Sequence, residues 1–466
     1  MTIFTAAIEQ ASDILWNSLL LFLLVGTGVF FTIRLRGVQL RRFGEGFHRV
    51  FGSFTLRGKK ADDQGMSSFQ ALATAIAAQV GTGNITGCAT ALVSGGPGAL
   101  FWVWVSAFFG MATIYAEAVL AQRYRTTVNG KVTGGPAYYI RAAFKGTFGK
   151  VLAGVFSVLI ILALGFMGNM VQSNSIGDAF HNAFGMSHLA VGIVVAVIAA
   201  FIFLGGVQRI AAVTEKIVPI MAAFYIVGCV VILVMNYKAL PNAFTQIFVL
   251  AFNPQAMAGG VAGVTVQQAM RFGVARGLFS NEAGMGSTPH AHALAKVNHP
   301  REQGAVAILG VFIDTFVVLT LNALVIISTL YTEGGPLAVG YTGDVTTVLS
   351  STNLAQTAFG VVMGESLGAK FVAVCLFFFA FSTILGWNLF GKINVIYLFG
   401  KKSPKVCTVI YTVIALVFIF LGTVTSSDLV WGLSDMFNQL MVIPNAIALF
   451  ALTGIVVRCV GGDKKQ

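Results

Sequence analysis

The residues Gly81-Thr82-Gly83-Asn84 interrupt an apolar run that otherwise extends from Phe69 to Val93. Glycine allows the backbone to leave helical geometry without a steric penalty. A helix that breaks inside a membrane exposes N–H and C=O groups where water is absent, which is tolerated only where the break lines a cavity or binds a ligand. The half-helix that follows directs unpaired N–H groups and a partial positive charge toward a carboxylate. The stretch therefore predicts a binding site, and close helix packing at Gly-x-Gly is the alternative explanation.

A second interruption occurs about two hundred residues further on, in another apolar stretch. It reads Arg276-Gly277-Leu278-Phe279-Ser280-Asn281-Glu282-Ala283-Gly284-Met285-Gly286. Interrupted helices at corresponding points of two half-chains mark the binding site of secondary transporters. We expect the first half-helix to end at Arg276, Gly277 and Leu278, whose carbonyl groups would then suit an ammonium group or Na⁺.

The composition places the chain in a membrane. Of its 466 residues, 56% are hydrophobic and only 10% are charged, and the mean hydropathy is +0.84. A soluble domain carries about 25% charged residues, whereas apolar runs of about 20 residues, the length that spans a bilayer, recur along this chain. The net charge of +12 resides mainly in the loops between these runs, which argues against nucleic-acid binding. Residues 1–12 contain no Lys or Arg, so we expect the first apolar run to stay in the mature protein.

The apolar runs predict an all-α polytopic membrane protein with eleven transmembrane helices. The predicted spans are Ile14–Ile33, Ser67–Val93, Ala99–Tyr124, Val151–Ile176, Leu189–Phe203, Ala212–Met235, Val261–Ala295, Ala305–Leu330, Ala369–Leu398, Val406–Leu421 and Met436–Val460. Re-entrant or surface helices are expected at Arg41–Phe51, Ala137–Phe144 and Thr346–Phe359.

The charge pattern and the two breaks predict an orientation and a repeat. Basic residues concentrate in the loops on one side, so we expect the N-terminus outside and the C-terminus in the cytoplasm. Each set of five spans opens with a broken helix, and the two broken helices start on opposite sides, as in a five-plus-five inverted repeat. The expected units are an extra N-terminal helix with a basic loop at 1–62, a first repeat at 63–240, and a second repeat with a short tail at 241–466.

Polar residues inside two further spans are candidate site residues. The adjacent hydroxyls of Ser382 and Thr383 lie in a Phe-rich span. Together with carbonyls of an unwound neighbouring helix they would form an oxygen shell for Na⁺, whereas bonds to a carbonyl four residues back are the alternative. Trp387 lies one turn after Thr383, where it either caps a small pocket or packs. Asn169 either contacts a substrate or joins two helices, because an unsatisfied amide is costly in apolar surroundings.

Charged residues within the spans are further functional hypotheses. They are Glu117, Arg271, Arg276, Glu282, Asp314 and Lys392. Arg271 and Asp314 are candidates for a gate or a proton relay, and Glu282 either lines the second break or caps its second half-helix. We find no nucleophile–base set, no convincing metal spacing around His290 and His292, and no repeated filter sequence. We therefore expect neither an enzyme nor a channel, and no cofactor.

Three strings resemble the prokaryotic alanine or glycine:cation symporter family. They are Gln79–Gly87 (QVGTGNITG), Gly277–Ser287 (GLFSNEAGMGS) and Ser382–Trp387 (STILGW). The resemblance extends over nearly the whole chain, from about Ile14 to Val460. It implies a leucine-transporter-type fold with an additional helix and a cation-coupled importer of small neutral amino acids, with Na⁺ as the usual coupling ion.

Carried onto the matching positions, the resemblance implies a substrate pocket and a Na⁺ site. The implied substrate residues are Gln79, Gly81, Phe166, Asn169, Gly277, Leu278, Thr383 and Trp387. The implied Na⁺ ligands are the carbonyl groups of Ala77, Val80 and Phe379 and the hydroxyl groups of Ser382 and Thr383. The bulk of Phe166, Leu278 and Trp387 would restrict the substrate side chain to a methyl group or a hydrogen atom.

The expected function is Na⁺-coupled import of alanine or glycine by alternating access across a prokaryotic plasma (inner) membrane. The expected partners are the amino acid, Na⁺ and the lipid bilayer, with no nucleic acid and with a monomer as the functional unit. A proton-coupled symporter or an amino-acid exchanger of the same fold, with serine or glutamine as substrate, is the alternative.

Overall fold

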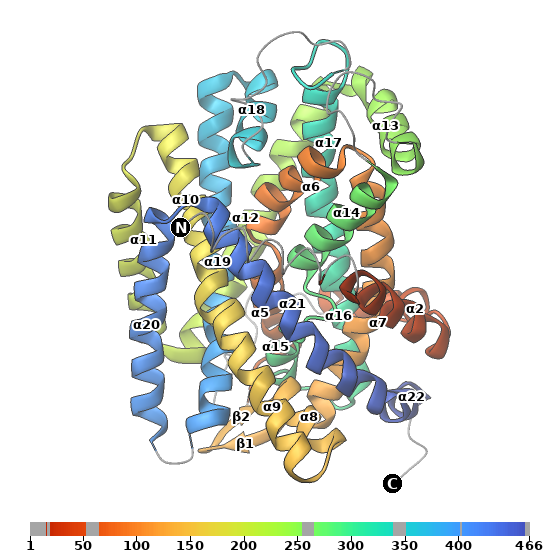
Figure 1. Cartoon of the computed structure of the whole chain (residues 1–466), viewed down its shortest axis with the longest axis vertical. Coiled ribbons are helices and arrows are strands. Elements are labelled where there is room, and N and C mark those ends of the chain that lie inside the picture. The colour runs from red at the N-terminus through yellow and green to blue at the C-terminus, as the bar shows by residue number, and fades with distance from the viewer. Residues whose placement is uncertain are drawn as a thin grey trace.

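A computed structural model describes residues 15, 19–52, 65–253, 265–338, 351–400 and 403–461. Within these ranges the chain is almost entirely helical, and most helices run along the long axis of an elongated bundle (Figure 1). This agrees with the all-α prediction. The described part adds one small two-stranded hairpin, β1 (Thr126–Val128) and β2 (Lys131–Thr133), whose strands pair antiparallel.

The first broken helix consists of α5 (Ser68–Gln79), a π-helical turn η2 (Gly83–Gly87) and α6 (Cys88–Gly95). A capping box starts α5, since the Ser67 hydroxyl accepts the N–H of Gln70 and the Gln70 side chain accepts the N–H of Ser67. The helix ends where Val80 adopts a ψ of 87°. The interruption therefore lies at residues 80–82, where the glycine-containing stretch predicts it.

The second broken helix differs from the prediction. Helix α14 (Val266–Asn281) continues without interruption through Arg276, Gly277 and Leu278. It stops at Glu282, a left-handed residue with φ of 58°, and α15 (Pro289–Ala293) follows after the turn. Gly277 allows close packing against α7 (Ala99–Arg123) rather than a break in the helix. A Cβ atom at this position would lie 3.0 Å from Ser106 Oγ. The carbonyl of Leu278 is also occupied, since it accepts the N–H of Glu282 at 2.8 Å.

The two broken helices run in opposite directions through the bundle. In Figure 1, α6 and α14 lie in the upper half, whereas α5 and α15 lie in the lower half. Helix α14 contacts α6, and α15 contacts α5. The two breaks therefore face each other near mid-height of the molecule.

Two long helices surround the breaks, and both contain π-helical segments, which are frequent at functional sites. One extends over Gly146–Phe184 as α9 (Gly146–Ile160), η3 (Ile161–Gly168) and α10 (Asn169–Phe184). The other extends over Pro300–Tyr331 as α16 (Pro300–Val311), η6 (Phe312–Leu319), α17 (Thr320–Ile326) and η7 (Ile327–Tyr331).

The remaining helices complete the bundle. They are α2 (Leu21–Arg34), α3 (Val38–Arg41), α4 (Phe43–Phe51), α8 (Pro136–Ala143), α11 (His188–Phe203), α12 (Gly206–Met235), η4 (Tyr237–Ala239), α13 (Leu240–Phe252), α18 (Ser351–Met363), α19 (Glu365–Phe399), α20 (Pro404–Val424), α21 (Ser427–Ala451) and α22 (Thr453–Gly461). The surface helices expected at Arg41–Phe51, Ala137–Phe144 and Thr346–Phe359 correspond to α4, α8 and α18, although residues 346–350 lie outside the described part.

Two parts of the chain differ from the predicted pattern. Helix α21 begins at Ser427, nine residues before the predicted Met436, and it bends by 58° into α22. Helix α13 was not predicted from the sequence. Its exposed face carries large apolar side chains such as Phe244 and Phe252. By length and composition, six described helices are able to cross a membrane, and two bent pairs, α2 with α3–α4 and α21 with α22, raise this number to eight. Helix α11 is also apolar, but it is shorter than these helices and is not included in this number.

Candidate functional site

An oxygen-rich cluster joins the first break to the middle of α19. Thr383 Oγ1 lies 2.8 Å from the carbonyl oxygen of Ala77, 3.5 Å from that of Val80 and 3.1 Å from that of Phe379. Ser382 Oγ lies 2.9 Å from the carbonyl of Phe379 and 3.5 Å from that of Ala77. Both hydroxyls are fully buried. All five predicted Na⁺ ligands therefore lie together, and the hydroxyls also form the bonds within their own helix that were the alternative.

The break itself is held by two side-chain amides. The N–H of Gly81 donates to Asn84 Oδ1 at 3.0 Å, and the N–H of Thr82 donates to Gln172 Oε1 at 3.1 Å. Position 81 has room only for glycine, because a Cβ atom there would collide with Thr383 Oγ1 and lie 3.0 Å from Gln172 Oε1. The unwound N–H groups thus form a site for a negatively polarised oxygen. Sequence reasoning missed Gln172, although it lies three residues after Asn169 and so on the same helix face.

Gln79 connects the two breaks. Its Nε2 donates to the carbonyl of Asn281, the last residue of α14, at 2.7 Å. Its Oε1 is buried and has no hydrogen-bond partner within the described ranges. This hydrogen bond connects the end of α14 to the last residue of α5. A movement of either half-helix would therefore displace residues at both breaks.

Trp387 and Glu282 meet at the second break. The indole Nε1 of Trp387 donates to Glu282 Oε1, and the Ser287 hydroxyl donates to Glu282 Oε2, both at 2.5 Å. The indole ring covers Gly168, where a Cβ atom would collide with it, and Phe279 packs edge-on against the ring. Trp387 therefore closes the space between α19, the π-helical segment η3 and the second break, and it is held there by a buried carboxylate.

A second buried carboxylate, Glu117 of α7, holds the unwound segment after Glu282. It accepts the N–H of Gly284 at 3.0 Å and the N–H of Gly286 at 2.9 Å. Asn445 of α21 donates to Glu117 at 2.7 Å and to the carbonyl of Gly284 at 2.9 Å, and Tyr139 of α8 donates to Asn445. Gly284 and Gly286 have positive φ values of 91° and 80°, so only glycine fits both positions without strain.

The predicted substrate residues Phe166 and Leu278 contact different parts of the bundle. The ring of Phe166, in the π-helical segment η3, stacks on that of Phe418 of α20 with centroids 4.8 Å apart, and it lies tilted beside the ring of Tyr411 at 5.7 Å. Leu278 lines two small cavities of about 20 and 10 Å³ that open toward α2, α7 and α21. That these two side chains line the substrate pocket remains a prediction, and Gly277 contacts α7 as described above.

Asn169 is fully buried as the first residue of α10. Its Nδ2 donates to the carbonyl of Gly165 at 2.9 Å, and its Oδ1 has no hydrogen-bond partner within the described part of the chain. The amide therefore keeps one buried acceptor available, and it does not act as an interhelical bond. Arg271, a gate candidate, lies with its guanidinium over the ring of Phe272, nearly three turns before the end of α14.

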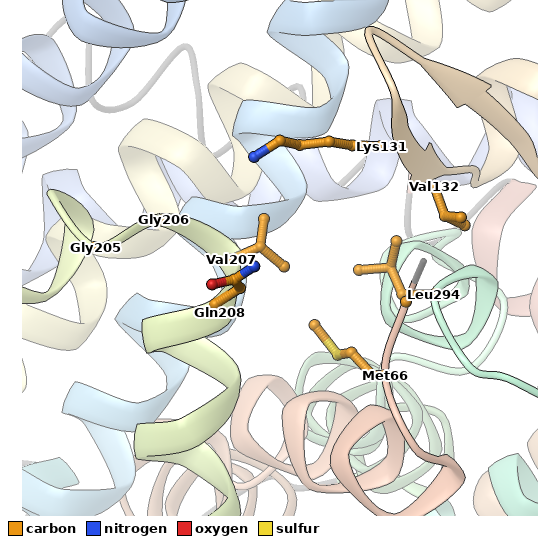
Figure 2. A pocket seen from close by; sticks show the side chains of 9 residues that line it. Met66, Lys131, Val132, Gly205, Gly206, Val207, Gln208 and Leu294 are labelled. Atoms are coloured by element: carbon orange, nitrogen blue, oxygen red, sulfur yellow. The ribbon is translucent and has the colours of Figure 1, made fainter. Parts of the chain in front are cut away.

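The lower ends of both broken helices are joined by backbone hydrogen bonds. The N–H of Met66 donates to the carbonyl of Leu294, and the N–H of Lys296 donates to the carbonyl of Met66, both at 2.8 Å. A cavity of about 240 Å³ lies directly beside this bridge (Figure 2). Lys131 of the hairpin and Gln208 of α12 face it from opposite sides.

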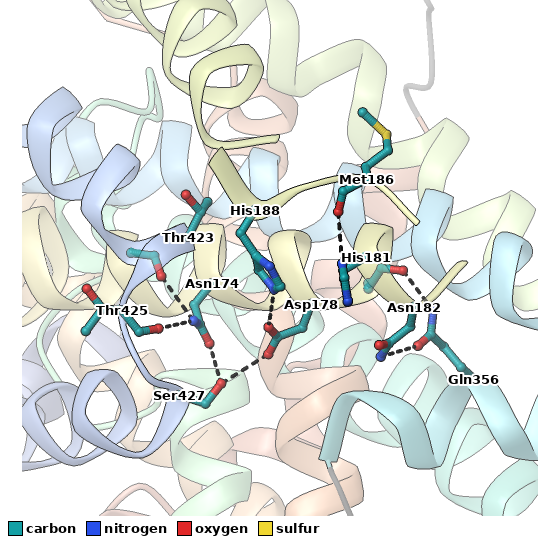
Figure 3. Close-up of polar contacts among 12 residues, drawn as sticks. Asn174, Asp178, His181, Asn182, Met186, His188, Gln356, Thr423, Thr425 and Ser427 are labelled. Atoms are coloured by element: carbon teal, nitrogen blue, oxygen red, sulfur yellow. Dashed lines mark hydrogen bonds and ion pairs between the residues drawn. The ribbon is translucent and has the colours of Figure 1, made fainter. Parts of the chain in front are cut away.

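The opposite end of the bundle carries a polar cluster around the turn between α10 and α11 (Figure 3). His188 Nε2 lies 3.1 Å from Asp178 Oδ1, and the ring of His188 stacks on that of His181. The Ser427 hydroxyl donates to both Asn174 and Asp178. These contacts tie the start of α21 to α10, which explains why α21 begins earlier than its hydropathy predicts.

The chain is similar to known proteins along its whole length. The sodium:alanine symporter family model matches residues 1–465. The chain is 41% identical to the sodium/alanine symporter AgcS of Methanococcus maripaludis over 97% of this chain and 96% of that one. It is 38% identical to the amino-acid carrier protein AlsT of Bacillus subtilis (99% and 93% covered). It is 39% identical to the "Probable sodium/glutamine symporter GlnT" of the same organism (96% and 88% covered).

The fold is also similar to solved structures. The crystal structure of a manganese transporter from Eremococcus coleocola matches with a TM-score of 0.54 and 14% identity, over 86% of this chain and 88% of that one. This likeness concerns the fold alone. The family relationship shows that the chain is a membrane transporter and no enzyme, with an amino acid as substrate and Na⁺ as the coupling ion. The chain belongs to the sodium:alanine symporter family.

Proposed function

We propose that this symporter imports alanine or glycine together with Na⁺ by alternating access across the plasma membrane. The observation that carries the proposal is the cluster of oxygen atoms around Thr383 Oγ1, 2.8 Å from the carbonyl of Ala77 across the first break. A hydroxyl on one helix and carbonyls at the unwound end of another provide the oxygen ligands that transporters use for Na⁺. Na⁺ would replace the hydroxyl hydrogen bonds and fix α5 against α19.

The Na⁺ site of this proposal consists of the carbonyls of Ala77, Val80 and Phe379 with the hydroxyls of Ser382 and Thr383. Neither hydroxyl carries a charge, so a bound ion leaves the site positive. The substrate carboxylate would bind next to it, at the N–H groups of Gly81 and Thr82. It would displace the oxygens of Asn84 and Gln172, which occupy those donors at 3.0 and 3.1 Å.

The ammonium end of the substrate needs acceptors, and two buried amide oxygens are available. They are Gln79 Oε1 and Asn169 Oδ1, both without a hydrogen-bond partner within the described residues. Trp387 covers Gly168 so closely that a Cβ atom there would collide with the indole ring. A substrate side chain larger than a methyl group would have to displace this ring, which supports alanine or glycine as the substrate.

The proposed topology has eleven spans, with an extra helix at 1–62 and two inverted five-helix repeats at 63–240 and 241–466. The opposite directions of the two broken helices support this arrangement. With the N-terminus outside, the backbone bridge between Met66 and Leu294 would lie on the cytoplasmic side. It would separate when substrate leaves, and Na⁺ must bind the two conformations unequally to bias their populations.

A larger substrate is the second candidate, because a relative carries the name of a glutamine symporter. Serine as a substrate would place one additional hydroxyl group beside Trp387, whereas glutamine would fit only with another rotamer of the indole ring. A proton-coupled symporter or an exchanger is the remaining alternative for the coupling. All of these would use the same site; the first two differ from the proposal in the substrate, and the others differ in the gradient that drives uptake.

Uptake of labelled alanine into proteoliposomes tests the proposal. We expect accumulation above the external concentration with an inward Na⁺ gradient and none when K⁺ replaces Na⁺. Unlabelled glycine should compete, and glutamine should not. Uptake driven equally well without Na⁺ would contradict Na⁺ coupling, and accumulation of glutamine in preference to alanine would contradict the proposed substrate.

A further inference from the structure

Glu282 has a backbone conformation in which helices usually carry glycine. It ends α14 with φ of 58° and ψ of 11°, in the left-handed region. Glycine is the usual residue at such a helix end, because a side chain there is strained. Strained residues other than glycine concentrate at functional sites, where the surrounding structure fixes them. A glycine would end α14 equally well, so the side chain of Glu282 needs an explanation of its own.

The carboxylate of Glu282 is fully buried between the second break and α19. Its Oε1 accepts the indole Nε1–H of Trp387, and its Oε2 accepts the hydroxyl of Ser287, both at 2.5 Å. An indole N–H can only donate a hydrogen bond. The ring of Trp387 therefore keeps this bond only in an orientation that turns Nε1 toward Glu282.

The opposite edge of the same ring faces Gly168. A Cβ atom at Gly168 would lie 2.5 Å from Cζ3 and 2.7 Å from Cε3 of Trp387. These two carbon atoms lie across the indole from Nε1, and Phe279 packs edge-on against the ring with centroids 5.9 Å apart. The indole therefore lies between Glu282 and Gly168, and the hydrogen bond at one edge determines the position of the other edge.

The contacts of the second break fix Glu282 itself. Its N–H donates to the carbonyl of Leu278 at 2.8 Å, and the carbonyl of the preceding residue, Asn281, accepts Nε2 of Gln79 at 2.7 Å. The carboxylate therefore cannot follow the indole ring when the ring rotates. Another rotamer of Trp387 would leave the buried indole N–H without this acceptor, which is unfavourable.

We propose that Glu282 is a positioning residue that limits the size of the transported amino acid by fixing the indole ring of Trp387. A substrate side chain larger than a methyl group requires the ring to rotate, and the hydrogen bond to Glu282 opposes this rotation. The inference rests on the proposed function, which places Trp387 beside the substrate. It deepens that proposal by naming the residue that controls the ring.

The experiment compares kcat/KM for Na⁺-driven uptake of alanine and of glutamine in proteoliposomes containing the full-length protein. Glu282→Gly removes the carboxylate and suits the left-handed backbone. We expect it to raise the glutamine-to-alanine ratio of kcat/KM by about tenfold or more, the scale of selectivity that one pocket contact controls. Glu282→Gln keeps a neutral, weaker acceptor for the indole N–H, so its ratio should be intermediate. Asn129→Gly, the matched control, replaces another left-handed residue in the exposed turn between β1 and β2 and should keep the natural ratio.

Trp387→Phe distinguishes positioning from a merely structural role. Phenylalanine keeps an aromatic ring but offers no N–H to Glu282, so this variant alone should raise the same ratio. Glu282→Gly should then have no further effect on the ratio in the Trp387→Phe background, because the two residues act through one hydrogen bond. A loss of stability alone would lower the uptake of both amino acids in proportion and leave the ratio unchanged.

The outcomes separate the inference from the proposed function. An unchanged ratio in Glu282→Gly, or a full further rise when Glu282→Gly is added to Trp387→Phe, would overturn the positioning role while alanine stays the preferred substrate of the natural protein. A preference of the natural protein for glutamine would instead overturn the proposed function. If Glu282→Gly does not fold, an unchanged ratio in Glu282→Gln overturns the inference.

Discussion

The hydroxyl of Thr383 in α19 lies 2.8 Å from the carbonyl oxygen of Ala77 in α5, although the two residues are 306 positions apart in the chain. Ala77 is in the last turn before the first break, where carbonyl groups lose their helical partners. One hydroxyl cannot satisfy several such carbonyls, and a cation can. This pair therefore connects the unwound helix to the helix that supplies the hydroxyl ligands.

Gly81→Ala should abolish most uptake. Its methyl group would collide with Thr383 Oγ1 and lie 3.0 Å from Gln172 Oε1, so either α5 or α19 must move. Overpacking of this kind costs about 1–3 kcal/mol, which corresponds to about a tenfold loss or more. Initial rates of Na⁺-driven alanine uptake measure the effect. Gly26→Ala in α2 is the matched control, since nothing lies within 4 Å of a Cβ atom there, and a similar loss in this control would show that the effect is not local.

Gln172→Glu should raise the KM for alanine by about tenfold or more, because a charged acceptor binds the N–H of Thr82 about twice as strongly as a neutral one. The new carboxylate would also repel the substrate carboxylate that we place at the same N–H groups. Gln267→Glu, on the exposed first turn of α14, introduces the same change away from the breaks. An unchanged KM in Gln172→Glu would contradict the proposed position of the substrate carboxylate.

Glu117→Gln should lower stability. The substitution replaces one of two acceptor oxygens by a donor, so that the N–H of Gly284 or Gly286 loses its partner. A buried donor left unsatisfied costs about 1–3 kcal/mol. Thermal unfolding in detergent should show a lower midpoint for this variant and an unchanged midpoint for Glu365→Gln, whose side chain is exposed at the start of α19. Equal midpoints for both variants would mean that Glu117 does not hold the second break.

The sequence predicts those features of the fold that local chemistry determines. The first break follows from glycines and polar residues within an apolar run, and hydropathy alone locates α7, α11 and α19 within a few residues. The adjacent hydroxyls of Ser382 and Thr383 are conspicuous because so few polar groups occur in that span. Each of these signals lies within a short stretch of chain.

Other features depend on contacts between distant segments, so the sequence does not reveal them. Gly277 is a plausible helix breaker by type, yet α7 packs against it and the helix continues to Asn281. Phe166 lies in a π-helical segment and its ring stacks on that of Phe418 in α20, a contact that the local sequence does not indicate. The role of Gln172 exists only because α10 lies beside the first break.

The most direct test of the Na⁺ site is the Na⁺ dependence of alanine uptake in Thr383→Ala, measured beside Cys229→Ala. Cys229 is equally buried but lies in α12, away from both breaks. We predict that the Na⁺ concentration for half-maximal uptake rises by about tenfold or more in Thr383→Ala, the effect of losing about 1.4 kcal/mol of binding energy, and stays unchanged in Cys229→Ala. The same Na⁺ dependence in both variants, or an equal loss of uptake in both, would contradict the proposed site.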